Sequence, residues 1–255
     1  MNKIISIIAL LLILPIFKVE AYDFVIDEIT YNFTKEHGTV EVSGLREFLN
    51  LEPGDRNSSL PLVVNIPPVV TYKDNKYDVV SIGYAAFQGC RKVTEIKIPS
   101  TVREIGEFAF ENCSKLEIIN IPDSVKMIGR CTFAECSGLK KVIYGSVIVP
   151  EKTFYGCSSL TEVKLLDSVK FIGEEAFESC TSLVSIDLPY LVEEIGKRSF
   201  RGCTSLSNIN FPLSLRKIGA NAFQGCINLK KVELPKRLEQ YRYDFEDTTK
   251  FKWIK

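Results

Sequence analysis

The chain has only one histidine, His37, and no excess of charge of either sign. Lys and Arg together number 32, and so do Asp and Glu. Nucleic acid and anionic membranes select basic protein surfaces, so a chain of zero net charge is not expected to bind either one as its main partner. His37 lies in a presumed turn between two predicted strands, and a single exposed turn histidine does not indicate catalysis.

Motifs that mark common catalytic and metal sites are also missing. The sequence has no G-x-S-x-G, no G-x-x-x-x-G-K-[ST], no H-E-x-x-H, no G-x-G-x-x-G and no C-x-x-C. We therefore expect a protein that is not an enzyme and that needs no cofactor and no metal. An enzyme that uses acidic residues of the N-terminal region is the weakest alternative, because sequence alone does not show which carboxylates pair.

One long hydrophobic run occurs, and it lies at the N-terminus. Residues 1–21 are typical of a secretory signal peptide: Lys3 gives a positive start, Ile4 to Ile16 is almost wholly apolar, and Val19-Glu20-Ala21 suits a cleavage site. A transmembrane helix is disfavoured, because the run is shorter than the roughly 20 residues that span a bilayer and Pro15 interrupts it. The mature chain, which shows no second hydrophobic span, is predicted to be secreted or held at the cell surface.

The dominant feature of the sequence is a repeated pattern. Seven of the eight cysteines recur at intervals of 23, 23, 21, 23, 23 and 23 residues, each with a phenylalanine three residues before it and an aliphatic residue three after it. Such a period is the mark of a solenoid, because one repeat cannot bury its apolar face alone and neighbouring repeats must stack. The cysteines are Cys90, Cys113, Cys136, Cys157, Cys180, Cys203 and Cys226, and the phenylalanines are Phe87, Phe110, Phe133, Phe154, Phe177, Phe200 and Phe223.

Each repeat predicts one strand and one return path. The pattern L-x-x-I-x-I indicates a short strand with alternate residues turned inward, and proline ends five of these strands because it has no N–H for the ladder. A second apolar pair follows, and then a glycine that suits a turn with positive φ. Stacked at the strand spacing of about 4.8 Å, the repeats predict a continuous parallel sheet over columns of Phe, Leu and Ile.

These residues carry a family resemblance. The pattern C-x-x-L-x-x-I-x-I-P-x-S-V-x-x-I-G-x-x-A-F, repeated over about residues 79–240, resembles the leucine-rich repeats of BspA-like surface proteins. The resemblance implies a curved leucine-rich repeat solenoid of β-strands and turns, with a role in adhesion or protein recognition at a cell surface. The coil from Leu139 to Phe154 departs from the pattern. It is two residues short and carries Val147-Ile148-Val149-Pro150 in place of S-V-x-x-I-G, so a local irregularity is expected there.

The two ends of the chain do not follow the repeat. Residues 22–78 are predicted to form an N-terminal β cap. It begins with a hairpin of two strands, Phe24 to Phe33 and Thr39 to Val42, joined through Lys35-Glu36-His37-Gly38. Residues 79–240 form the solenoid, and residues 241–255 form a C-terminal cap or tail, because repeat arrays need covered ends. Asp244-Phe245 is interpreted as out of register, which leaves the last coil incomplete. The alternating tail from Lys250 predicts a final strand or cap, with a docking segment as the alternative.

The outward residues of the predicted strands form the candidate binding face, on the concave side of the sheet. They differ from repeat to repeat, which suits recognition of a protein ligand such as a host surface or extracellular matrix protein, although exposed positions also drift when nothing constrains them. Ile118 and Ile143 form an apolar spot within this mixed surface. The alternative is a structural or matrix component that associates with its own kind through solenoid ends or edges. The candidate residues are Glu95, Lys97, Ile118, Asn120, Lys141, Ile143, Glu162, Lys164, Ser185, Asp187, Asn208, Asn210, Lys231 and Glu233.

The cysteines of an exported chain suggest either disulfides or a column of buried thiols. Neighbouring repeats would place Cα atoms about 5 Å apart, within disulfide range, yet a stacked column rarely orients both Cβ atoms for a bond. Free buried thiols are therefore favoured. Cys131 lies outside the repeated position, is predicted to lie near the surface, and is the candidate reactive thiol.

Overall fold

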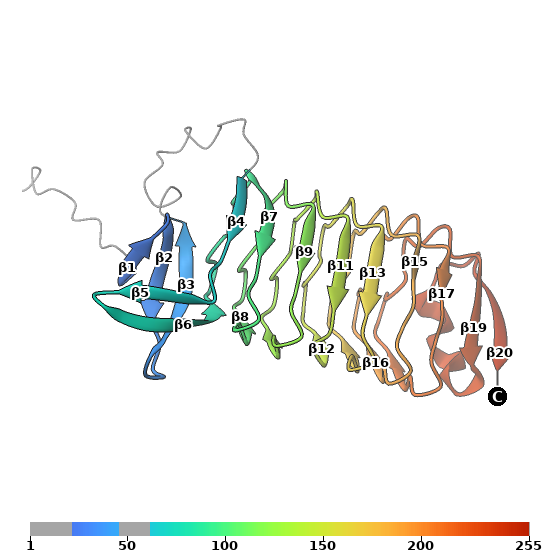
Figure 1. Cartoon of the computed structure of the whole chain (residues 1–255). Helices are drawn as coiled ribbons and strands as arrows, with labels where there is room; N and C mark the ends of the chain where they lie inside the picture. Colours follow the sequence, from blue (N-terminus) through green and yellow to red (C-terminus); the bar gives the residue numbers. More distant parts are fainter. Residues whose placement is uncertain (1–21, 46–61, 255) are drawn as a thin grey trace, which may run out of the picture.

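The computed structural model describes residues 22–45 and 62–254, so the predicted signal peptide lies outside the described residues. The chain winds into a rod of stacked coils that runs from the N-terminal strands to the C-terminal ones (Figure 1). The predicted fold class is confirmed: the rod is a β-solenoid with repeats of about 23 residues and little helix.

One face of the rod is a row of parallel strands, here called the front sheet. Pleating turns alternate side chains of each strand into the core. Ladder pairing joins the first five strands in the order β13-β11-β9-β7-β4, and the pairs β15-β17 and β19-β20 continue the row. The strands are β4 (Leu62–Asn65), β7 (Val93–Lys97), β9 (Ile118–Asn120), β11 (Lys141–Tyr144), β13 (Glu162–Leu165), β15 (Ser185–Ile186), β17 (Asn208–Ile209), β19 (Lys231–Pro235) and β20 (Lys250–Ile254).

A second parallel ladder of mostly two-residue strands, here called the back ladder, follows the return path of the coils. It consists of two runs, β6-β8-β10 and β12-β14-β16-β18. The strands are β6 (Asn75–Ile82), β8 (Glu104–Ile105), β10 (Met127–Ile128), β12 (Ile148–Val149), β14 (Phe171–Ile172), β16 (Glu194–Ile195) and β18 (Lys217–Ile218).

A column of phenylalanine rings fills the core between the front sheet and the back ladder. Successive rings from Phe87 to Phe223 stack with centroids 5.2–5.5 Å apart, and every ring is fully buried. One ring from each coil therefore enters the core, as the spacing of the phenylalanines predicts.

A column of cysteines runs beside the rings, and all eight cysteines of the chain are free thiols. Six of them donate the thiol proton to the carbonyl oxygen of the phenylalanine one coil earlier, at 3.0–3.2 Å, as Cys113 does to Phe87. Burial raises the pKa of the Cys157, Cys180 and Cys203 thiols well above the ordinary value. These protonated thiols tie neighbouring coils together, which agrees with the free thiols that the sequence favours.

The glycines of the return path allow neighbouring coils to stack closely. The prediction that these glycines have positive φ is wrong. A Cβ atom on Gly129 would lie 2.3 Å from the backbone nitrogen of Glu107, so only glycine lets the two coils approach. Left-handed conformations fall instead on residues two positions before each phenylalanine, such as Phe108 at φ 58° and Cys131 at φ 55°. Non-glycine residues at these positive φ values carry no obvious mark in the sequence.

The short coil from Leu139 to Phe154 interrupts the back ladder, which confirms the predicted irregularity. The ladder breaks between β10 and β12, and the Ser146 hydroxyl donates a hydrogen bond to the Lys126 carbonyl across this break, at 3.1 Å. Tyr144 lies where most of the other coils have an aliphatic residue, and its phenol donates to the Ile148 carbonyl at 2.7 Å. The buried aromatic side chain thereby spans the shortened coil.

The N-terminal strands cover the core and also extend both ladders. β2 and β3 form the predicted hairpin, while β1 folds back onto β2 through a turn at Asp27 and Glu28, so the single strand expected from Phe24 to Phe33 is in fact two. β3 pairs in parallel with β6, and β4 pairs in parallel with β7, so stacking begins before residue 79. The strands are β1 (Phe24–Ile26), β2 (Ile29–Phe33), β3 (Thr39–Leu45) and β5 (Val69–Tyr72), the last of which pairs with β6.

The C-terminal residues complete one more coil. Phe245 stacks on Phe223 with ring centroids 4.5 Å apart, and the Asp244 carbonyl accepts a hydrogen bond from the Phe223 N–H, as Ala222 does from Phe200. The interpretation of Asp244-Phe245 as out of register is therefore wrong, because the 3-10 helix η1 (Lys236–Asp244) absorbs the difference in spacing. β20 then pairs with β19 along its whole length, as the final strand predicted for the tail.

Candidate binding face

The front sheet turns the predicted candidate residues toward solvent. Glu95 is half-exposed and the others, from Lys97 to Glu233, are exposed. The parallel register places residues at equivalent positions of neighbouring coils side by side. The structure thus brings the candidates together on one face, while their role in binding stays a prediction.

Two isoleucines form an apolar spot on this face. Ile118 is 57% exposed and Ile143 is 36% exposed, and they lie on the adjacent strands β9 and β11. Ile118 is opposite Lys141, and Ile143 is opposite Asn120, so the two isoleucines are diagonal neighbours. Polar residues therefore border the spot on both strands, an arrangement in which an apolar contact is surrounded by groups that can hydrogen-bond.

Ion pairs between coils hold part of the face in place. The Lys141 ammonium group lies 2.7 Å from a Glu162 carboxylate oxygen, and Lys252 lies 2.6 Å from Glu233. All four side chains are about half-exposed or more, so each pair contributes at most about 1 kcal/mol to stability. Their main consequence is to orient these side chains and to neutralise their charges.

Asn210 has a structural contact that sequence reasoning missed. Its side-chain amide accepts a hydrogen bond from the Leu188 N–H at 2.6 Å and donates to the Leu188 carbonyl at 3.0 Å. The amide thereby replaces ladder hydrogen bonds beside the short strand β15. Asn210 is solvent-exposed, but this bidentate contact restricts the side chain that was predicted to serve a ligand.

Cys131 is buried, and its predicted position near the surface is wrong. Its exposed fraction is 7%, and burial raises the pKa of its thiol. A reactive cysteine needs access and a large thiolate fraction, and Cys131 has neither advantage. The prediction that Cys131 is a reactive thiol depended on a position near the surface, and the structure does not place it there.

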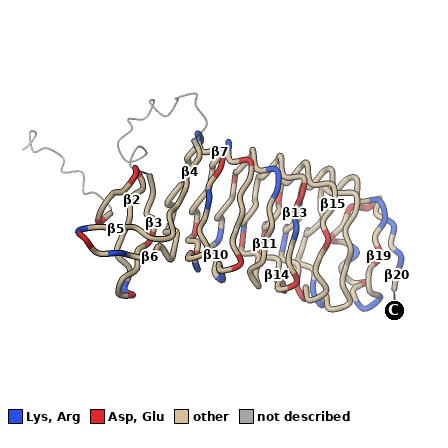
Figure 2. The backbone as a smooth tube through the Cα atoms, in the orientation of Figure 1, with Lys and Arg blue, Asp and Glu red and all other residues tan. Residues whose placement is uncertain are grey.

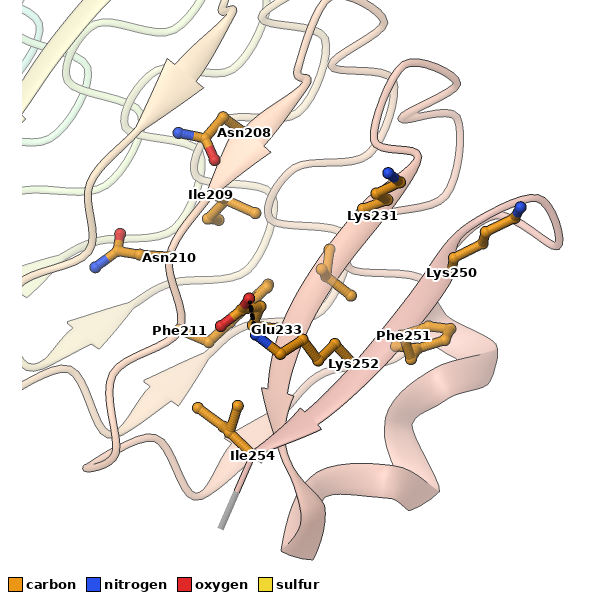
Figure 3. Close-up of a pocket in the computed structure, with 11 residues that line it drawn as sticks. Asn208, Ile209, Asn210, Phe211, Lys231, Glu233, Lys250, Phe251, Lys252 and Ile254 are labelled. Atoms are coloured by element: carbon orange, nitrogen blue, oxygen red, sulfur yellow. Dashed lines mark hydrogen bonds and ion pairs between the residues drawn. The ribbon is translucent and has the colours of Figure 1, made fainter.

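A hollow of about 490 Å³ lies at the C-terminal end of the front sheet. Figure 3 shows its polar lining, with Lys231 and Glu233 on β19, Lys250 and Lys252 on β20, and Glu233 paired with Lys252. Asn208, Ile209, Phe211 and Ile254 complete much of the wall. Lys250 and Lys252 were not among the residues predicted for the binding face. They nevertheless alternate with apolar residues as Lys231 and Glu233 do, 19 residues earlier.

Other kinds of site find little support in the part of the chain that the structure describes. His37 is exposed in the turn between β2 and β3, and no group of three metal-ligating side chains occurs among the described residues. None of the helices in the described ranges is long and apolar enough to span a membrane.

The repeat is also matched by a known family. A model of the BspA type leucine-rich repeat region, with six copies, matches residues 71–149 and 147–254. The chain belongs to the BspA-type leucine-rich repeat family. Repeat families of this type are generally binding scaffolds, and leucine-rich repeat proteins generally bind proteins. No curated protein matches this BspA-type chain.

Solved structures agree with the family assignment. A leucine-rich repeat protein from Bacteroides ovatus is 56% identical, with 92% of this chain and 100% of that chain covered and a TM-score of 0.50. The T. pallidum leucine-rich repeat protein is 23% identical, with 91% and 100% covered and a TM-score of 0.51. A leucine-rich repeat protein from Eubacterium ventriosum is 24% identical, with 78% and 50% covered and a TM-score of 0.60. At these identities the last two show the fold alone.

Proposed function

We propose that this BspA-type chain is secreted or displayed at the cell surface, where it binds a protein partner in adhesion through its front sheet. The observation that carries the proposal is the exposed apolar spot of Ile118 and Ile143 within a polar surface. Buried apolar anchors inside a polar rim supply most of the binding energy of protein interfaces.

The architecture supports this use of the front sheet. Parallel strands about 4.8 Å apart let one ligand contact several coils together. The stacked rings and thiols beneath the sheet keep its backbone rigid, so little conformational entropy is lost when a partner docks. Host surface proteins and extracellular matrix proteins are the partner classes that we propose.

The test is capture of immobilised extracellular matrix proteins by residues 22–255 and by the double variant Ile118→Asp with Ile143→Asp. We expect the double variant to lose capture while it keeps the thermal midpoint of the wild type, because both side chains point away from the core. Lys126→Glu, an exposed change beside the back ladder, is the matched control and should capture normally. Normal capture by the isoleucine variant together with loss in the control would place the binding site elsewhere.

Self-association is the second candidate function. β4 and β20 each have a strand partner on one side only among the described residues, and an unpaired parallel edge can accept another strand. Sedimentation at several protein concentrations separates the two candidates. A mass that increases with concentration would favour self-association. A constant monomer mass would favour the binding of a different protein.

A further inference from the structure

Charged side chains of neighbouring coils usually face a charge of opposite sign. Arg130 lies 3.0 Å from Glu107, and Lys197 lies 2.8 Å from Glu174, each 23 residues apart. Because stacking places equivalent positions side by side, a rod of this kind needs such alternation to avoid repulsion along its length. The other pairs between neighbouring coils are Lys140–Glu117, Lys141–Glu162, Lys152–Glu175, Arg198–Glu175, Arg201–Glu178, Lys217–Glu194 and Lys252–Glu233.

The last two front strands break this rule. Lys231 of β19 is directly opposite Lys250 of β20, and among the described strand pairs this is the only cross-strand pair of like charge. Neither ammonium group has an ion-pair partner among the residues that the structure describes. Figure 2 shows the resulting gathering of basic residues at the C-terminal end of the rod. Like charges opposite each other destabilise a sheet unless an anion lies between them.

The surroundings of the two lysines suit an anionic group that is attached to an apolar one. Both lysines line the hollow of about 490 Å³, together with Ile254, which is half-buried and lies on the same side of β20 as Lys250 and Lys252. Lys252 is neutralised by Glu233, so Lys231 and Lys250 supply the uncompensated positive charge (Figure 3).

We propose that the hollow binds an extended acidic segment of a protein partner, with an Asp or Glu carboxylate between Lys231 and Lys250 and an apolar side chain against Ile254. This inference rests on the proposed function and names a subsite of the same front sheet. A uniformly anionic chain, such as a sulfated polysaccharide, fits less well because it has no apolar group to place against Ile254.

The experiment measures fluorescence polarisation of a labelled peptide of alternating Glu and Val against the intact mature protein. A peptide of alternating Gln and Val is the matched ligand control. Lys231→Gln with Lys250→Gln should weaken binding of the Glu peptide by about tenfold or more, whereas Lys115→Gln with Lys126→Gln should change it by less than about twofold. Binding of the Glu peptide should also weaken as salt is added.

Three outcomes would overturn the proposal. They are equal binding of the Glu and Gln peptides, unchanged binding by the Lys231 and Lys250 variant, and stronger binding of a heparin fragment than of the Glu peptide at the same two lysines. Capture of matrix proteins by this lysine variant separates the subsite from the proposed function. If the lysine variant captures normally and the isoleucine variant does not, the subsite fails and the proposed function stands.

Discussion

Ile118 and Ile119 are the same amino acid at adjacent positions of one strand, and the solenoid uses them in opposite ways. Ile118 is 57% exposed, whereas Ile119 is 3% exposed and belongs to the core. The pleat of the strand alone separates the two. The comparison extends to the whole rod, because inward positions hold nearly the same residue in every coil while outward positions change. The inward residues stabilise the rod, and the recognition that we propose would use the outward residues of the same strands.

The largest effect should come from a gap in an inward column. Phe177→Ala leaves a ring-sized void between Phe154 and Phe200, and we expect it to lower the free energy of unfolding by about 3–5 kcal/mol. Chemical denaturation measures this loss. A midpoint equal to that of the wild type would contradict the stacked column.

Smaller losses of stability are expected when glycines are replaced, and their size should differ between a glycine that packs against the next coil and a glycine with positive φ. Gly129→Ala brings a Cβ against the backbone of Glu107 and should cost about 2–3 kcal/mol, since backbone atoms cannot move aside. Gly89→Ala meets nothing within 4 Å but has a φ of 72°, and should cost only about 1 kcal/mol. Denaturation of both variants tests the order, and a larger loss at Gly89 would show that conformation matters more than stacking.

Alkylation tests whether the inward thiols are all protected. In the native protein we expect iodoacetamide to leave all eight cysteines unmodified, including Cys131, because burial hinders access and raises its thiol pKa. In denaturant all eight should react. Mass spectrometry that finds Cys131 modified first, or Cys113 bridged to Cys136, would show that the thiol column differs from the structure.

The smallest effect concerns Glu41, which lies at the edge of the back ladder on β3. Burial raises the pKa of its carboxyl, the Ser81 hydroxyl lowers it, and the Glu104 charge raises it. A raised folded-state pKa means that the protonated carboxyl favours folding, and that this contribution is lost as pH rises through the folded-state pKa. Glu41→Gln should therefore raise the thermal midpoint at neutral pH and change it little below the unfolded-state pKa. A gain confined to acidic pH would reverse this sign.

Much of the fold could be predicted from the sequence because stacking makes each coil obey the same spacing. Phe110 and Cys113 recur in every repeat, so their burial and register follow from the period. The direction of Ile118 follows from the alternation within its strand. These features depend on local pattern and repetition, and both are visible in a sequence.

Other features depend on contacts between specific coils and could not be predicted. The turn at Asp27 and Glu28 uses positive φ at two non-glycine residues. The contact of Asn210 with Leu188 depends on a short neighbouring strand. Lys250 lies beside Lys231 because the segment from Phe245 to Lys250 is shorter than the one from Phe223 to Lys231, a change of spacing that the repeat does not predict.

The most direct test of the division between inward and outward residues is the thermal midpoint of two single variants, Ile118→Asp and Ile119→Asp. The same chemical change is made at adjacent positions, so only the direction of the side chain differs. We expect Ile118→Asp to unfold within about 2 °C of the wild type, and Ile119→Asp to lose many degrees or fail to fold, because an unpaired charge enters the core. Equal losses in the two variants would contradict the account, because Ile118 would then be part of the core and unavailable to a partner.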